Sequence, residues 1–428
     1  MNARDLVSIL LTIDGGDRKL RDLVNLHTVD ALVCLAAGAG AKEASSLLAF
    51  YRETGAGDAI SSAAGASAVI RFTEWDAIHV PSCATPDAMA VPAALAFAQD
   101  YGTYVKAVAA GHSVGVALSE AVGGVSALPE TWPGLFAAPA AAAVSAAIAL
   151  DLSEEQVAQA LVLAMAGSSG RNGRPSGMPS ARWLVIGEAT FKGIRAALAA
   201  KAGVKGDLDL LSPVWMKGQA AAASALEAKH VDPMAIACVG VKPFVSARQG
   251  MNAIQAFSSL LQKGLDPDAI ETVQVFLPLV AVPVVSRPLD TEDRLSTIAH
   301  LGLQLGIAAY EPPRLMDVDR SRPFDGKALD LARRVTVTSD DDLALEGWPA
   351  RVVVSEKGQT REAVWPQNSG ENLQSALDRK LESLQSAVMR PLQRIGAAFA
   401  GADLSAVAEA RGLMRSLTGF PVSKSEAA

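Results

Sequence analysis

Long apolar runs made mostly of alanine, with glycine among them, constrain this chain more than any other feature. The runs 135–150 and 156–166 are typical, and half of the 428 residues are hydrophobic. Because alanine is small and only weakly apolar, such runs favour helices that pack closely in a large core. We find no stretch of about 20 strongly apolar residues and therefore predict no transmembrane helix. The surplus of apolar surface favours burial in an oligomer.

The charge balance and the cysteines narrow the class of protein. The net charge is −7 and no basic stripe is present, so we expect no nucleic-acid partner. The first five residues lack the layout of a signal peptide. Cys34, Cys83 and Cys238 are odd in number and widely spaced, which indicates neither a disulfide framework nor a cysteine-based zinc site. We therefore predict a cytoplasmic protein with reduced thiols and no membrane partner.

Hydrophobic spacing divides the chain into a helical part and a mixed part. Helices are predicted over 17–37, 41–53, 91–100, 105–121, 134–150, 153–166, 187–202, 218–228, 249–261, 373–399 and 404–417. Strands are predicted over 272–280, 334–338, 350–355 and 360–365, the last two as a hairpin. The prediction is therefore a mainly α protein with an inserted α+β domain. Residues 1–237 form the helical domain, 238–367 the α+β domain, and 368–428 a helical segment that returns to the first.

One short segment, 71–86, gathers several chemistry-bearing side chains. It holds Glu74, Asp76, His79, Cys83 and Thr85. An irregular polar loop before a buried helix is a common setting for a small-molecule site. Glu74 and Asp76 are two apart, so in an extended segment they would point the same way and could split their pKa values. The alternative is that one of them caps a nearby helix.

Two further patterns suit the binding of an anionic ligand. The Gly/Ser loop 167–179 carries Arg171 and Arg174, and Arg182 follows it. Backbone amides together with guanidinium groups suit a carboxylate or phosphate ligand. The alternative is a solvated surface loop. The stretch 241–250 holds Lys242, Ser246 and Arg248 at the predicted domain junction, where ligands often bind. Structural ion pairing is the alternative there.

Gly111-His-Ser-Val-Gly115 matches the Gly-x-Ser-x-Gly elbow of serine hydrolases. That motif needs a strand before the serine and a helix after it. The surrounding composition favours a buried helix, and a hydrolase using Ser113 stays as a lesser alternative. His79 and Cys83 could form a catalytic pair, but we interpret Cys83 as a small pocket-lining residue.

Several segments, in this order, resemble the MmgE/PrpD family. They are 73–96, Val108-Ala-Ala-Gly-His-Ser-Val, Trp132-Pro-Gly-Leu-Phe-Ala, Ala181-Arg-Trp-Leu-Val-Ile-Gly, Val241-Lys-Pro-Phe and Ala247-Arg-Gln. Members of this family include 2-methylcitrate dehydratase, cis-aconitate decarboxylase and iminodisuccinate epimerase. The resemblance implies a large helical domain, a smaller α+β lid domain, a homodimer, and no required metal or cofactor. It also implies proton abstraction next to a carboxylate, followed by loss of water or carbon dioxide or by reprotonation.

The resemblance also suggests roles for individual residues. By position, the catalytic residues would be Asp76, His79, Lys242 and Glu74. Taken with the patterns above, the substrate-binding candidates are Arg182, Arg248, Thr85, Arg171, Cys83 and Ser246. The sequence departs from the family pattern at Ala77, where a second aspartate is common, and at Thr85, where a histidine is usual. Two functions therefore stay open, a divergent lyase or isomerase acting on a small acid and a non-catalytic descendant that binds a small acid or a protein partner.

Overall fold

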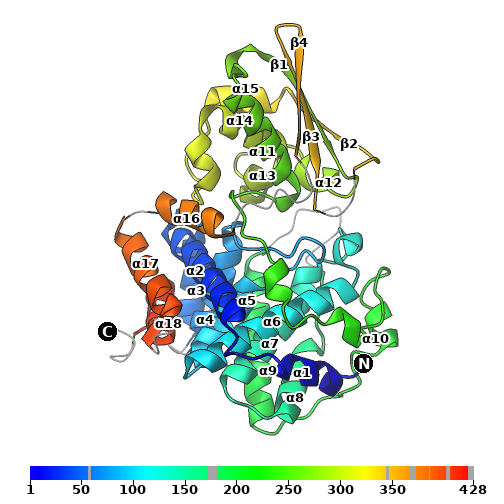
Figure 1. Ribbon diagram of the computed structural model, residues 1–428, viewed down its shortest axis with the longest axis vertical. Helices are drawn as coiled ribbons and strands as arrows, with labels where there is room; N and C mark the ends of the chain where they lie inside the picture. The colour runs from blue at the N-terminus through cyan, green and yellow to red at the C-terminus, as the bar shows by residue number, and fades with distance from the viewer. Residues whose placement is uncertain are drawn as a thin grey trace. The chain divides into compact units, whose positions relative to one another are not determined.

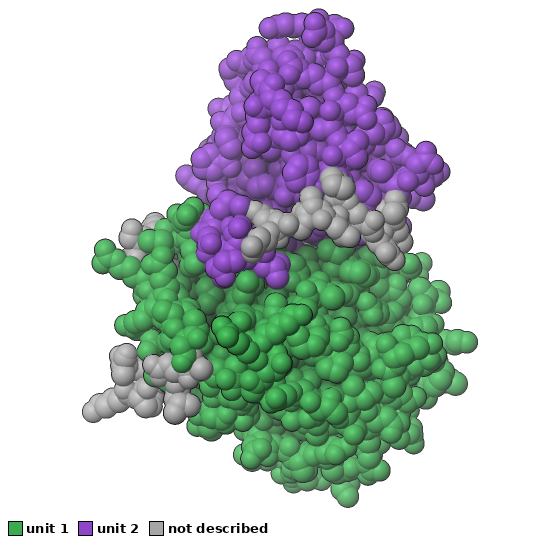
Figure 2. All heavy atoms as spheres, in the orientation of Figure 1, with its two compact units in different colours: residues 1–241, 380–428 green, residues 242–379 purple. Residues whose placement is uncertain are grey.

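The computed structural model describes residues 1–55, 59–171, 181–343, 347–365, 373–384, 386–401 and 405–422. The chain forms two compact units, coloured separately in Figure 2. Unit 1 comprises Met1–Val241 and Lys380–Ala428, and unit 2 comprises Lys242–Arg379. The sequence placed the corresponding limits of the inserted domain at 238 and 367.

The regular secondary structure in the described residues of unit 1 is helical. Its helices are α1 (Ala3–Leu11), α2 (Arg18–Gly40), α3 (Ser45–Thr54), α4 (Ala59–Phe72), α5 (Asp87–Phe97), α6 (Tyr101–Ala121), α7 (Pro133–Ala149), α8 (Glu154–Met165), α9 (Leu184–Lys201), α10 (Pro213–Lys217), α17 (Ser386–Ala400) and α18 (Ser405–Thr418). Helix α16 (Leu373–Ser383) contains the boundary between the units. The returning helices pack on the first ones, α17 against α2 and α18 against α4 (Figure 1).

Close helix packing, expected from the alanine-rich runs, is a property of this unit. Every residue of α7 is buried. A Cβ atom added to Gly193 of α9 would lie 2.4 Å from the carbonyl oxygen of Pro139, and one added to Gly111 would lie 2.0 Å from Ser145 Oγ. Glycine is needed at both positions because any side chain would push the helices apart.

Helix α2 qualifies by length and composition alone as a membrane-crossing helix. However, 67% of its apolar window is buried inside the protein. Burial of this kind is typical of a core helix, which agrees with the prediction from the sequence.

The sequence predicted most helices of unit 1 to within a few residues, including the capping box of Ser153 and Gln156 at the start of α8. The helix predicted over 218–228 is wrong, because 218–227 forms turns and irregular chain and only 228–230 makes a short 3-10 turn. Helices α1 and α4 and the short helix α10 were not predicted. Helix α4 is buried on all sides from Ser61 to Phe72, so it has no polar face to reveal a period.

Unit 2 combines helices with one mixed sheet. Its elements are α11 (Arg248–Gln262), β1 (Ile270–Leu277), α12 (Val282–Val285), α13 (Arg294–Ala299), α14 (Leu301–Tyr310), α15 (Gly326–Ala332), β2 (Val335–Ser339), β3 (Ala350–Glu356) and β4 (Gln359–Trp365). The strand order is β2-β1-β3-β4, with β1 parallel to β2 and the other pairs antiparallel. Helix α11 packs on β3 and β4. The predicted hairpin is confirmed, and Lys357 and Gly358 both take positive φ in its two-residue turn.

Candidate functional site

The irregular segment 73–86 joins α4 to α5 within unit 1. Two short antiparallel bridges fix its path, one between Ile78 and Gly240 and one between His79 and Ala84. Glu74 takes a positive φ of 53°. The expectation of an extended run from Glu74 to Asp76 is therefore wrong, since the chain turns at Glu74. The two carboxylates nevertheless meet, because both accept hydrogen bonds from Arg71.

Arg71 ends α4 and is the centre of a buried ionic cluster. Its Nη2 donates to Glu74 Oε2 at 3.0 Å, and its Nη1 donates to Asp76 Oδ1. Glu74 Oε1 also accepts from Arg182 Nε at 2.9 Å and from Trp183 Nε1 at 3.1 Å. Asp76 is fully buried, and Glu74 is nearly so. Both carboxylates are committed to arginines, which makes them better suited to holding cations in place than to abstracting protons.

Arg182 links this cluster to less buried surroundings. Its guanidinium carbon lies 4.3 Å from the centre of the Trp132 ring, and its side chain is 24% exposed. Within the described residues, only Nε of this guanidinium makes a hydrogen bond. The stacked geometry therefore leaves Nη1 and Nη2 available to an anion.

His79 differs from the two acids because no arginine among the described residues bonds to it. Its Nδ1 lies 2.8 Å from Ser82 Oγ and 3.9 Å from Glu120 Oε1. Burial lowers the pKa of His79 to about 4, so the ring is neutral at pH 7. Nε2 makes no hydrogen bond to the described part of the chain. Either Nδ1 or Ser82 can be the donor in their bond, and when Nδ1 donates, the Nε2 lone pair is free to accept a proton.

Three other predicted residues of unit 1 have simpler surroundings. Thr85 is buried, and its carbonyl accepts from the Ala88 amide at the start of α5. Cys83 is buried with a positive φ of 54°, and its thiol lies 3.8 Å from the Val80 carbonyl oxygen. Arg171 has an exposed side chain. The rest of its predicted loop, including Arg174, lies outside the described residues apart from the stretch 167–171.

Lys242, Ser246 and Arg248 belong to unit 2. Lys242 and Ser246 are buried, and Ser246 Oγ donates to the Ile298 carbonyl at 3.3 Å. Arg248 opens α11 and donates to Asn252 Oδ1 at 3.3 Å and to the Gly347 carbonyl at 3.5 Å. Burial lowers the pKa of Arg248 to about 10, and no carboxylate among the described residues pairs with it. An arginine at a helix N-terminus that has no carboxylate partner is suited to binding an anion. Arg248 is therefore a candidate anion-binding residue of unit 2.

A buried ion pair that the sequence did not reveal lies beside the segment 73–86. Lys380 donates to Asp30 Oδ1, and both side chains are fully buried. Lys380 Nζ also donates to the Trp75 carbonyl at 2.8 Å. Although burial opposes the charged form, Asp30 raises the pKa of Lys380 above its usual value. The pair therefore anchors the chain just before Asp76 to α2 and to the returning segment.

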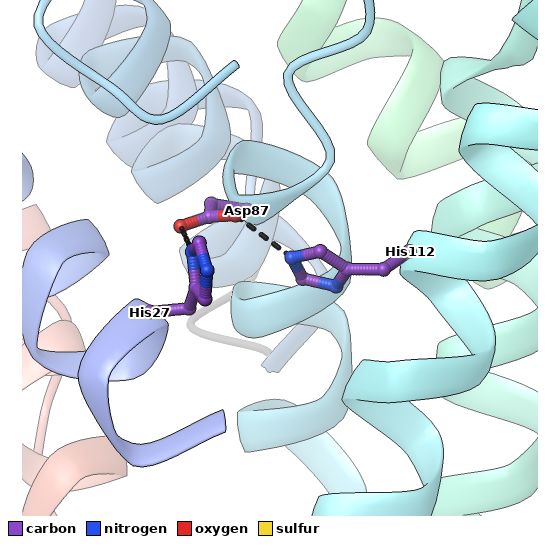
Figure 3. Close-up of side chains that lie close together, drawn as sticks. All are labelled: His27, Asp87 and His112. Atoms are coloured by element: carbon purple, nitrogen blue, oxygen red, sulfur yellow. Dashed lines mark hydrogen bonds and ion pairs between the residues drawn. The ribbon is translucent and has the colours of Figure 1, made fainter. Parts of the chain in front are cut away.

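A second buried cluster lies at the other end of the segment (Figure 3). Asp87, the first residue of α5, meets His27 of α2 and His112 of α6. His27 Nδ1 lies 2.9 Å from Asp87 Oδ2, and His112 Nε2 lies 2.8 Å from Asp87 Oδ1. All three side chains are fully buried. Burial opposes ionisation of Asp87, but the two histidines together hold the pKa of its carboxyl well below the usual range.

This cluster was missed because its members lie far apart in the sequence. The chain has only five histidines, and two of them are fully buried here. Scarce histidines inside otherwise apolar helical runs were the one available signal.

The serine hydrolase alternative is wrong. Ser113 lies in the middle of α6, which is continuous from Tyr101 to Ala121, and its side chain is buried. In the described part of unit 1, α6 follows α5 after a short connection, with no strand before the serine. The strained strand-to-helix turn that exposes a nucleophilic serine is therefore missing from that position.

Comparison with known proteins adds one finding. The family model described as the MmgE/PrpD N-terminal domain matches residues 11–230, just over half of the chain. The matched region contains the whole segment 73–86, together with Arg182, and ends before Lys242. A search of curated proteins finds no match.

Proposed function

The chain belongs to the MmgE/PrpD family, and on that premise we propose that it is a lyase or isomerase acting on a small acidic metabolite. The reaction would begin with removal of a proton from a carbon next to a carboxylate. The observation that carries this proposal is the state of His79, a buried but neutral imidazole whose Nε2 is free of hydrogen bonds to the described residues.

In this proposal His79 moves the proton. Ser82 fixes the ring through Nδ1, and Nε2 takes the proton from the substrate carbon. The electron pair of the broken C–H bond moves into the carboxylate-stabilised enolate. Protonation of the carbon from the opposite side would complete an isomerisation, whereas departure of a β-hydroxyl group with a proton, as water, would complete a dehydration.

Arg182 would receive the substrate carboxylate. Its Nε is fixed by Glu74 and its plane by Trp132, so the remaining guanidinium nitrogens are pre-oriented. Charge on the enolate would be stabilised by the same guanidinium. Glu74 and Asp76 then act as positioning residues that hold Arg182 and Arg71. Lys242 and Arg248 remain candidates for anion binding within unit 2.

The test is proton exchange measured by NMR. Purified protein in deuterated buffer, with a panel of small di- and tricarboxylates, should incorporate deuterium or produce a new alkene signal. His79→Gln should lower the rate by about 10²–10⁴-fold. His300→Asn is the matched control, because His300 caps α14 through Nδ1 and asparagine can keep that cap. Equal rates in the wild type and His79→Gln would remove His79 from the reaction.

A binding function is the second candidate. It is favoured by the commitment of both Glu74 and Asp76 to arginines, and by Thr85 at the position where the family usually has a histidine. Calorimetric binding of a carboxylate from the panel, lost in Arg182→Gln and unaffected in His79→Gln, with no exchange in either protein, would support binding without turnover.

A further inference from the structure

The cluster of His27, Asp87 and His112 has no part in the proposed reaction, yet its composition is that of a metal site. Each residue comes from a different helix, and one ligand atom from each lies within 4.8 Å of the others (Figure 3). Two imidazoles and a carboxylate form a donor set that zinc and other first-row transition metals bind readily.

The orientation of His112 is that of a metal ligand. Its Nδ1 lies 2.8 Å from the Val108 carbonyl oxygen, one helical turn earlier in α6. A carbonyl oxygen can only accept, so Nδ1 carries the hydrogen. Nε2, on the opposite side of the ring, is directed at Asp87. Metal-binding histidines commonly donate their other N–H to a backbone carbonyl in this way, which fixes both tautomer and ring direction.

The arrangement of hydrogen-bond donors and acceptors points the same way. With its hydrogen on Nδ1, His112 presents the lone pair of Nε2 to Asp87 Oδ1 at 2.8 Å, so two acceptor atoms face each other in a fully buried site and something between them must bind both. His27 Nε2 is buried as well and has no hydrogen-bond partner among the described residues. A divalent cation would replace the protons between the rings and the carboxylate.

We propose that His27, Asp87 and His112 bind one divalent transition-metal cation, of which zinc is the representative. Because the three side chains are fully buried, the cation would tie α2, α5 and α6 together instead of meeting substrate. It would also fix the start of α5, where the segment 73–86 ends. This proposal is independent of the proposed reaction.

The test uses the full-length chain without an affinity tag, unfolded in urea with a chelator and refolded with or without Zn²⁺. Refolding is needed because the site is closed in the folded protein. After desalting, metal analysis should find about one equivalent of zinc per chain. The zinc-refolded protein should also unfold at a higher urea concentration. Asp87→Asn should retain less than about a tenth of the wild-type zinc, whereas His300→Asn should retain all of it.

Failure to retain zinc in the refolded wild type would overturn the proposal and leave the cluster as a hydrogen-bonded imidazole–carboxylate network. Equal retention in the wild type and Asp87→Asn would also overturn it. If Asp87→Asn does not fold, X-ray absorption of the zinc-loaded wild type decides the matter. Scattering from two imidazole rings with no sulfur ligand supports the site, and a sulfur ligand or a single imidazole contradicts it.

Discussion

The two units use buried cations in different ways. In unit 1, buried cations face carboxylates, as Arg71 faces Glu74 and Asp76 and Lys380 faces Asp30. In unit 2, buried arginines bond mainly to backbone carbonyls, although Arg314 also pairs with Glu311 at 3.2 Å. Arg320 donates to the carbonyls of Arg314 and Val245 at 3.2 and 2.9 Å, and Arg294 donates to that of Val318 at 2.9 Å.

Arginine–carbonyl contacts and cation–carboxylate contacts have different roles in the fold. A carbonyl held by an arginine fixes the path of irregular chain, as in the stretch 311–325 of unit 2. A carboxylate held by a cation keeps a full charge inside the core, where it can hold a second cation or orient a reacting group. The ionic arrangements of unit 1 cluster around the segment 73–86, which is where the family resemblance also places the chemistry.

The largest effect should come from Arg71. Arg71→Met leaves two buried carboxylates without their shared guanidinium, and should lower the free energy of unfolding by about 3–5 kcal/mol. Urea unfolding, with the midpoint and slope both fitted, measures the loss. Arg4→Met is the control, because Arg4 pairs with Glu155 on the surface and its loss should have little effect. Equal losses in the two variants would contradict a difference between buried and exposed pairs.

A pH titration tests His79, a buried histidine whose ring contacts the Ser82 hydroxyl more closely than any carboxylate of the described residues. The pKa of His79 is about 4 in the folded protein and near 6.5 when unfolded. Between these values the unfolded chain binds more protons, so stability falls as the pH is lowered from 6.5 to 4. This one group should account for about 3 kcal/mol. The loss should be smaller by that amount in His79→Gln, measured by urea unfolding at each pH, and parallel profiles would show that His79 titrates normally.

Arg320 provides the corresponding test in unit 2. Arg320→Met leaves the carbonyls of Arg314 and Val245 without this donor and should cost about 1–3 kcal/mol, less than the change at Arg71. Chemical unfolding monitored by circular dichroism gives the value. Arg333→Met, which removes an exposed arginine, serves as the control. A cost at Arg320 as large as that at Arg71 would erase the distinction between the units.

Ser113 should give the smallest effect. Its hydroxyl is buried and makes no hydrogen bond to a side chain or to a backbone carbonyl within the described residues. Ser113→Ala should change stability by less than about 1 kcal/mol, in the stabilising direction, because a polar group without a partner is removed. Thermal unfolding is sufficient to measure this. A clear loss of stability would show that the hydroxyl has a partner after all.

The fold was predictable wherever local signals agreed with the final packing. Ser153 and Gln156 marked the start of α8, and the β3–β4 hairpin followed from alternating residues around a Lys-Gly turn. The failure at 218–228 has a physical cause. Alanine-rich composition favours a helix, but without an apolar stripe a short helix gains too little from packing to form.

The candidate site was less predictable, because tertiary contacts define it. His27 and Asp87 are 60 residues apart, and Lys380 is 350 residues from Asp30. Sequence proximity drew attention to Glu74, Asp76 and His79. It could not show that Arg71 donates hydrogen bonds to both carboxylates, nor that His79 has no arginine partner among the described residues.

The distance between Asp30 and Lys380 has a consequence for the chain during its synthesis. Helix α2 is among the first segments to leave the ribosome, and its aspartate has no lysine to pair with until 350 further residues have been added. Unit 2 is complete by then, because all of its residues are made before Lys380. The domain whose residues come first is therefore the last to reach its final core, and a chain that stops early leaves a charge buried without its counterion.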